Sequence, residues 1–319
     1  MTSGLLLIDK PEGPTSNYVV GKVRRRLGRS VKVGHTGTLD PCASGLLVIL
    51  VGTATRALDY LDETKKHYRV RIRLGEESDT CDREGKITVV GDASGVTLEA
   101  IESCLNRFLG QSAQIPPNFS AIKKNGIPLY KLARKGVFPL VETRQIEIFR
   151  LSVLEWNAPD LDIDVECSKG TYVRSLARDI GIALGVGGRV ETLRRISSGK
   201  FHVDTAHNLE FISNAPVAEI QRSLIPLYQA LEHIPEIKTS VADLRKLAFG
   251  SHIDIPDTEP LVIPEISNDP DMIYRVQDKQ GRSVILVRVD EKSNVRVLRP
   301  TKVFITDSGT TPEEEFAST

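Results

Sequence analysis

Apolar and polar residues alternate strictly along residues 67–75, which read HYRVRIRLG. One face of this stretch carries apolar or aromatic side chains and the other carries arginines: Tyr68, Val70, Ile72 and Leu74 against Arg69, Arg71 and Arg73. A repeat of two residues is typical of a β-strand with one buried face. The pattern therefore predicts a half-buried strand with a basic outer face.

Other apolar runs predict both strands and helices. Strands are expected at 4–8, 145–156 and 162–168, and helices at 16–28, 53–66 and 97–110. Thr15 or Ser16 can cap the first of these helices, and Gly28 can end it. The run GLLVILVG at 45–52 fits a buried strand or a buried helix. We expect a strand-to-helix junction at 170–185 and a helix running into a strand at 187–201.

Two prolines, Pro226 and Pro235, interrupt the pattern and predict a domain boundary. Beyond them, residues 240–250 have the spacing of a helix, and 273–304 read as strands separated by turns. We expect a large domain over residues 1–235 and a small β-rich domain over 236–305. The tail, 306–319, has a composition typical of disorder.

The charges balance overall but are unevenly distributed. The chain has 42 basic and 42 acidic residues, so it lacks the positive excess typical of many nucleic-acid binders. Two basic clusters nevertheless stand out: Lys22, Arg24, Arg25, Arg26, Arg29 and Lys32, then Lys123, Lys124, Lys131, Arg134 and Lys135. They fit either an RNA-contacting surface or ordinary solvated faces, and charge alone leaves both readings open.

The cysteines and the apolar runs bear on metal sites and location. The chain has four cysteines, none spaced as CxxC, which argues against a structural zinc site. Scattered cysteines in a chain of this length fit a reducing cytoplasm. The apolar run near the N-terminus is too short for a signal peptide, and LLVILV is far shorter than a membrane span. We therefore expect a cytoplasmic protein without a membrane segment.

Residues 34–41, GHTGTLDP, place a carboxylate, Asp40, in a constrained turn. Two glycines permit unusual backbone geometry, and Pro41 restricts Asp40 to extended conformations. A carboxylate held in this way can act as a nucleophile or a base, although an ordinary turn aspartate gives the same pattern. His35 and Cys42 could form a nucleophilic pair, but no cysteine-protease signature surrounds them.

A second segment, CSKGTYVRS at 167–175, gathers Lys169, Tyr172 and Arg174 around a glycine. Arg174 could pair with a carboxylate such as Asp40 and keep it ionised. Taken alone, it could equally be a surface arginine, and Tyr68 an ordinary core tyrosine. No GxxxxGK[ST], HExxH or GxSxG motif is present.

Six blocks, in order, resemble the TruB-type tRNA pseudouridine synthases, a bacterial branch of the pseudouridine synthase superfamily. They cover roughly residues 4–205 and read LLLIDKPEGPTSN, GHTGTLDPCASGLLVILVGTATR, KHYRVRIRLGEESDTCDREG, QIPPNFSAIKKNGIPLYKLARKG, CSKGTYVRSLARDIGIALG and LRRISSGKF. The resemblance implies a mixed α/β catalytic domain around a long, mainly antiparallel sheet. It also implies a small PUA-like C-terminal domain, whose acidic stretches make RNA contact there doubtful.

By this resemblance, the protein isomerises uridine 55 in the T-loop of tRNA to pseudouridine without a metal or an organic cofactor. The substrate partner is the T-arm, and we expect a monomer. The resemblance does not decide whether the aspartate attacks C1′, attacks C6 of uracil, or starts a glycal route by removing the 2′ proton.

The resemblance also assigns roles to residues. Asp40 corresponds to the nucleophilic aspartate, Arg174 to its partner, and Tyr68 to a ring that packs on the uracil and helps take the C5 proton. The base pocket would comprise His35, Tyr172, Leu193, Asp82 and Lys169. The RNA backbone would meet Lys22, Arg24, Arg25, Lys123, Lys124, Lys131 and Arg134, the last four within a tRNA-clamping insertion at about 112–150.

Two other functions share these residues. An RNA chaperone that grips the tRNA elbow without essential chemistry would use the same basic clusters. An unrelated hydrolase could use Asp40 as its nucleophile, but no metal-ligand or histidine cluster in the sequence supplies a group to activate water.

Overall fold

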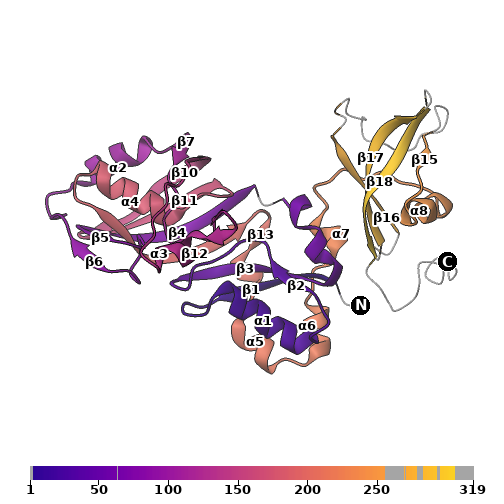
Figure 1. Cartoon of the computed structure of the whole chain (residues 1–319), viewed down its shortest axis with the longest axis horizontal. Helices are drawn as coiled ribbons and strands as arrows, with labels where there is room; N and C mark the ends of the chain where they lie inside the picture. The colour runs from indigo at the N-terminus through magenta and orange to yellow at the C-terminus, as the bar shows by residue number, and fades with distance from the viewer. Residues whose placement is uncertain are drawn as a thin grey trace.

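The computed structural model describes residues 3–62, 64–255, 269, 271–278, 283–292 and 295–305. Figure 1 shows a long sheet and, at one end of the molecule, a separate small sheet. The acidic tail at 306–319 and most of the acidic stretch at 254–271 lie outside the described residues. The expectations about them therefore stay predictions.

The long sheet is mainly antiparallel. Its strands run in the order β14–β1–β3–β12–β4–β11–β10–β7, with β13 paired to β12 and β2 to β3. Their bounds are β1 Gly4–Lys10, β2 Val33–His35, β3 Ala43–Val51, β4 Lys65–Leu74, β7 Gly110–Gln114, β10 Arg144–Asn157, β11 Asp160–Ser168, β12 Gly188–Ser198, β13 Phe201–His202 and β14 His207–Asn208. The pairs β1–β14 and β3–β12 are parallel. This confirms the expected mixed α/β fold class.

The helices and the smaller sheets complete the fold. The helices are α1 Ser16–Leu27, α2 Leu98–Asn106, α3 Leu129–Ala133, α4 Val173–Ala183, α5 Leu209–Asn214, α6 Val217–Arg222, α7 Leu227–Ala230 and α8 Val241–Ala248. Two hairpins pair β5 Glu76–Ser78 with β6 Ile87–Val89, and β8 Lys123–Lys124 with β9 Ile127–Pro128. The small sheet contains β15 Ile253–Asp254, β16 Ile273–Gln277, β17 Ser283–Lys292 and β18 Val295–Ile305. No helix of the described ranges is long and apolar enough to cross a membrane.

The helix predicted at 16–28 and the strand predicted at 67–75 both form, as α1 and β4. Thr15 caps α1 by accepting a hydrogen bond from the backbone N–H of Tyr18, and Gly28 follows its last residue with φ 111°. Along β4 the apolar positions are buried, whereas the arginines are exposed or half-buried. The outward arginines therefore share one face of the sheet.

Two predicted helices are wrong. Residues 53–66 form two 3₁₀ turns, η1 Gly52–Arg56 and η2 Leu58–Tyr60, before β4 begins. Residues 188–198 form no helix but the whole of β12, which lies between β3 and β4. Neighbouring strands on both sides satisfy its backbone, so tertiary pairing overrides local propensity. The undecided run at 45–52 is strand β3.

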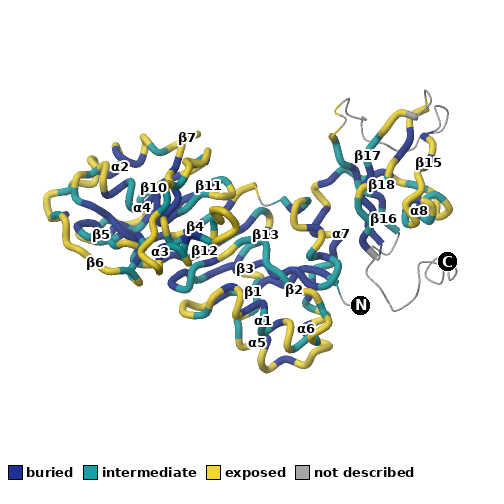
Figure 2. Tube along the Cα trace, viewed as in Figure 1, coloured by how far each residue is buried: buried dark blue, intermediate teal, exposed yellow. Residues whose placement is uncertain are grey.

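Two apolar clusters lie against the long sheet, and a third forms the interior between the small sheet and α8. One lies between the long sheet and helices α1, α2 and α4, where Figure 2 shows the central strands as buried. The other lies on the opposite side of β1 and β3 and includes α7 together with Val284, Leu286 and Phe304 of the small sheet. The small sheet therefore meets the rest of the described chain through α7 and the 3₁₀ turn η1. The predicted domain limits and the PUA-like assignment stay predictions.

Candidate active site

The loop that carries Asp40 joins β2 to β3 and is fixed from several sides. The Ser16 hydroxyl donates to the Leu39 carbonyl at 2.9 Å and accepts from the Leu39 N–H at 2.8 Å. The N–H of Gly13 donates to the Pro41 carbonyl at 2.8 Å. Both neighbours of Asp40 are thus held by backbone hydrogen bonds, which leaves its carboxylate little freedom to move.

The carboxylate of Asp40 meets the guanidinium of Arg174, from the first turn of α4. The distance from Arg174 Nε to Asp40 Oδ2 is 2.9 Å, and the two side chains are 5% and 35% exposed, respectively. The buried guanidinium attracts the carboxylate and fixes its orientation. The structure thus brings together two residues that lie 134 positions apart (174 − 40 = 134).

Arg174 also holds two other segments. Its Nη1 donates to the Thr80 carbonyl at 2.9 Å and lies 3.3 Å from Asp82 Oδ2, and its Nη2 donates to the Phe119 carbonyl at 2.8 Å. Burial alone would lower the pKa of Arg174, but the charges of Asp40 and Asp82 raise it. The guanidinium therefore stays charged and ties three loops together.

Asp82 lies behind Arg174 and is buried. Its Oδ1 accepts hydrogen bonds from the Thr80 hydroxyl and, at 3.0 Å, from the Glu84 N–H. This network satisfies a buried carboxylate and fixes the far side of the guanidinium. Asp82 thus acts through Arg174 in this geometry.

Tyr68 is buried on β4, opposite Arg195 of β12. Burial raises the pKa of the Tyr68 phenol to about 12, against the opposing charge and hydrogen bond of Arg195. The Tyr68 ring thus lies in the sheet beside Arg195, and both roles that the resemblance implied for it, packing on the uracil and helping to take the C5 proton, stay predictions.

Three other predicted pocket residues lie on neighbouring elements. Leu193 of β12 pairs with Ala43, directly after the Asp40 loop. Tyr172 caps α4, and the side chain of Gln114 bonds both its N–H and its carbonyl. His35 is half-buried in β2, at the start of the same loop.

The remaining predicted residues lie outside this cluster. Lys169 is exposed in the turn between β11 and α4. On α1, Lys22 is half-buried while Arg24 and Arg25 are exposed; Lys123, Lys124, Lys131 and Arg134 are exposed on the segment from β8 to α3. No hydrogen bond or ion pair between described residues joins these side chains to Asp40. Their proposed RNA contacts rest on exposure and charge.

Sequence reasoning missed three buried cations beside the loop: Lys10, Lys66 and Arg195. Lys10 Nζ donates to the carbonyls of Pro11 and Pro14, both at 2.9 Å, and burial lowers its pKa to about 8. Arg195 donates from Nη2 to the Gly37 carbonyl at 3.0 Å and from Nε to the Leu46 carbonyl at 2.7 Å. Lys10 follows Asp9 at the end of LLLI, and Arg195 stands beside another arginine in TLRRISS, so the local sequence did not mark either as buried.

A possible ligand set for a metal ion lies close by, but its chemistry does not suit one. The ligand atoms of Cys42, Asp82 and Glu84 lie within 4.8 Å of one another. Burial raises the pKa of Cys42 to about 12, so it holds a neutral thiol rather than the thiolate that metals prefer. Asp82 is already engaged by Arg174. These three residues therefore do not form a convincing metal centre.

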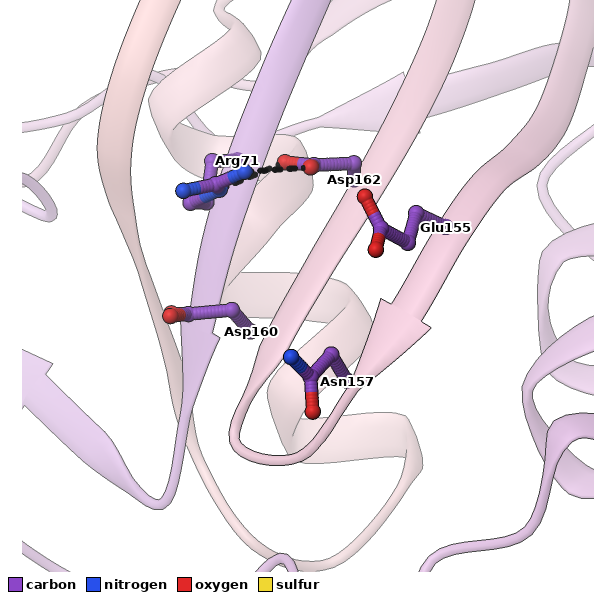
Figure 3. Close-up of a pocket in the computed structure, with 5 residues that line it drawn as sticks. All are labelled: Arg71, Glu155, Asn157, Asp160 and Asp162. Atoms are coloured by element: carbon purple, nitrogen blue, oxygen red, sulfur yellow. Dashed lines mark hydrogen bonds and ion pairs between the residues drawn. The ribbon is translucent and has the colours of Figure 1, made fainter.

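A small cavity of about 60 Å³ lies on the other face of the sheet. Figure 3 shows its lining: Arg71, Glu155, Asn157, Asp160 and Asp162. Arg71 and Tyr68 occupy positions of opposite parity on β4, so the cavity and the aspartate site lie on opposite faces. This cavity is not part of the site around Asp40.

Family models match most of the region that carries the site. Residues 24–173 match the TruB family pseudouridylate synthase N-terminal domain, and 174–232 match the tRNA pseudouridylate synthase B C-terminal domain. The chain is 40% identical to tRNA pseudouridine synthase B of Syntrophotalea carbinolica, over 83% of this chain and 85% of that one. It is 44% identical to tRNA pseudouridine synthase B of Geobacter sulfurreducens, over 77% of this chain and 81% of that one.

A solved structure of a Cbf5–Nop10–Gar1 complex supports the same class. It aligns with a TM-score of 0.70 and 26% identity, covering 95% of this chain and 85% of that one. The fold and the site thus have the form of a pseudouridylate synthase. The chain belongs to the TruB family.

Proposed function

We propose that this protein isomerises uridine to pseudouridine in tRNA, at position 55 of the T-loop. The observation that carries the proposal is the contact of Arg174, on α4, with Asp40, whose loop is fixed on both sides of the aspartate. The names of the curated relatives supply the reaction and the tRNA substrate. The position and the T-arm come from the sequence blocks alone.

The reaction is a rearrangement that needs no other substrate. The bond from C1′ to N1 breaks, the uracil turns, and a bond from C1′ to C5 forms. The hydrogen on C5 leaves to solvent as a proton, and N1 takes up a proton. Each of the three routes left open requires an ionised aspartate in contact with the nucleotide, and the charge of Arg174 supports that state.

The surrounding residues would receive the base once it leaves the stack. Tyr68 offers an aromatic ring, Leu193 an apolar wall, and Tyr172 and His35 polar edges near the loop. An enzyme that acts on a base must extrude it and surround it in this way. Asp82 would orient Arg174 rather than touch the uracil.

The segment at 112–150 is the proposed grip on the RNA. It exposes basic side chains together with apolar ones, including Phe138 and Leu140. Single-stranded RNA loops are bound through stacking and phosphate contacts, which such a surface can supply. We keep the proposals of a T-arm partner, a monomer, a cytoplasmic location and no cofactor. The chaperone and hydrolase alternatives gain no specific support.

Release of tritium from C5 tests the reaction directly, because rearrangement must expel that hydrogen. A T-arm stem-loop and full-length tRNA, each labelled at C5 of the target uridine, would be incubated with wild type, Asp40→Asn and Asp162→Asn. Asp162 is a carboxylate on the outer face and serves as the matched control. We expect release by wild type and the control, and a loss of at least about a thousandfold in Asp40→Asn.

No release by folded wild type from either RNA would refute the synthase assignment and favour the binding-only alternative. Equal release from a stem-loop in which the labelled uridine stands elsewhere in the loop would instead refute the assignment to position 55. Normal release by Asp40→Asn would leave the reaction standing but remove Asp40 from it.

A further inference from the structure

Arg195 is almost completely enclosed in the middle of the long sheet. Its side chain is 1% exposed, and its strand, β12, lies between β3 and β4. Within the described ranges it forms no ion pair with a carboxylate. Burying a cation without such a partner costs several kcal/mol, so stability alone does not favour arginine at this position.

The guanidinium instead bonds two segments that border the site and stands opposite a third. It donates to the Leu46 carbonyl in β3 and to the Gly37 carbonyl in the Asp40 loop, and Arg195 is the cross-strand partner of Tyr68 in β4. It therefore links the loop that carries the proposed nucleophile to the ring that would receive the base.

The contact with the loop is close. A Cβ atom added to Gly37 would lie 2.7 Å from Lys66 Nζ and 3.5 Å from Arg195 Nη1. The loop thus rests on two buried cations, three residues before Asp40. Strand β3 is equally close, because a Cβ at Gly45, where φ is +101°, would lie 2.2 Å from the Arg195 carbonyl.

We propose that Arg195 is a positioning residue for the isomerisation, setting the Asp40 loop and the Tyr68 ring in one fixed relation. Its fork reaches the Gly37 and Leu46 carbonyls together while Tyr68 faces it across the strand pair, which a lysine cannot reproduce. This proposal rests on the proposed function. A misplacement of about 1 Å at such a site costs about a hundredfold in rate.

The neighbouring residue provides a matched control. Arg194 points to the other side of β12 and forms a two-pronged pair with Asp9, at 3.0 and 2.8 Å, while 41% exposed. Arg194→Lys makes the same chemical change one position away. Neither Arg194 nor Asp9 belongs to the proposed catalytic or RNA-binding set.

The test compares Arg195→Lys, Arg195→Met, Arg194→Lys and wild type. Circular dichroism and melting temperature establish that each variant is folded. Affinity for the T-arm stem-loop is measured by filter binding, and the rate of tritium release is measured in a single turnover with enzyme in excess.

We expect both Arg195 variants to bind RNA within about twofold of wild type while the single-turnover rate falls at least tenfold. Arg194→Lys should stay within about twofold on both measures. Should the Arg195 variants fail to fold, Arg195→Gln, which keeps a donor on a shorter neutral side chain, takes their place, and there too the rate should fall while affinity holds.

Folded Arg195→Lys that turns over at the wild-type rate would overturn the proposal, as would a loss of affinity with an unchanged rate at saturation. If only Arg195→Gln can be measured, a normal rate in that variant overturns it. Inactive wild type is a separate outcome, because it refutes the proposed function itself.

Discussion

Arginine–aspartate pairs occur on both faces of the long sheet, and they differ in how many groups share one guanidinium. On the outer face, Arg71 grips Asp162 with two hydrogen bonds of 2.8 and 2.7 Å, as Figure 3 shows. On the inner face, Arg174 is shared between Asp40, Asp82 and two backbone carbonyls. Both carboxylate oxygens of Asp162 are therefore paired, whereas one carboxylate oxygen of Asp40 has no partner among the described residues.

That open oxygen is Oδ1 of Asp40. Arg174 contacts Oδ2, and Oδ1 makes no hydrogen bond or ion pair within the described chain. In the outer pair both carboxylate oxygens are occupied by the fork of Arg71. A carboxylate that is charged, oriented and still half exposed can react, whereas a fully paired one contributes only modest surface stability.

The strongest way to break this contrast is Arg174→Lys. Lysine keeps the charge but cannot reach Asp40, Asp82 and two carbonyls at once. We expect the single-turnover rate to fall about a hundredfold or more, with RNA affinity within about threefold of wild type. The rate of tritium release and filter binding measure the two effects separately.

The folded state of this variant must be checked, because breaking a buried ion pair can cost about 3–5 kcal/mol. Arg178, one helical turn further along α4 and largely outside the cluster, offers a control in Arg178→Lys. A collapse of affinity with normal turnover of bound RNA would show that Arg174 serves RNA binding instead.

Asp82→Asn tests whether the second carboxylate positions the guanidinium. The asparagine keeps the shape and the acceptor for the Glu84 N–H but loses the charge that faces Arg174. We expect a loss of about tenfold in the chemical rate, smaller than for Arg174, because the Asp40 contact remains. A loss as large as that of Asp40→Asn would mean that Asp82 itself takes part in the chemistry.

The buried thiol of Cys42, two residues after Asp40, predicts how the stability of the inner site depends on pH. Burial, together with the charges of Asp82 and Asp40, raises the pKa of the thiol from its ordinary 9.0 to about 12. The folded state therefore prefers the protonated thiol. The resulting stability is fully present below pH 9 and is lost as pH rises from 9 towards 12, by at most about 1.4 kcal/mol per pH unit.

Cys42→Ala removes this contribution. We expect the free energy of unfolding in urea to fall less steeply above pH 9 in the variant than in wild type. Cys167 and Tyr68, whose pKa values burial also raises, remain in both proteins and cancel in the difference. Parallel curves for the two proteins would show that the Cys42 thiol is accessible to water.

The sequence could predict the parts of the fold that depend on local pattern. Strict alternation identified β4 and its basic outer face, and the Thr15 cap and Gly28 marked the ends of α1. Strand β12 escaped because TLRRISS has the charge and apolar spacing of a helix. Its strand form follows from its place between β3 and β4, which no local pattern contains.

The residues of the site likewise divide into those that a local pattern marks and those that no local pattern marks. GHTGTLDP and KGTYVRS indicated Asp40 and Arg174 because turns and charges mark them in the sequence. The groups that hold the loop did not stand out, because their roles depend on distant partners. Ser16 bonds Leu39, and Arg195 bonds Gly37. Such contacts across the chain become visible only when the strands are assembled.

The smallest expected effect is that of Arg71→Lys on the outer face. Arg71 and Asp162 are 43% and 23% exposed, so water and salt compete with their pairing. We expect the variant to lose less than about 1 kcal/mol of stability in urea unfolding and to release tritium at the wild-type rate. The substitution matches Arg174→Lys in chemistry but changes a partly exposed arginine with one carboxylate partner, on the opposite face of the sheet. A large loss of activity here would mean that the outer face also takes part in RNA binding or catalysis, and the contrast between the faces would fail.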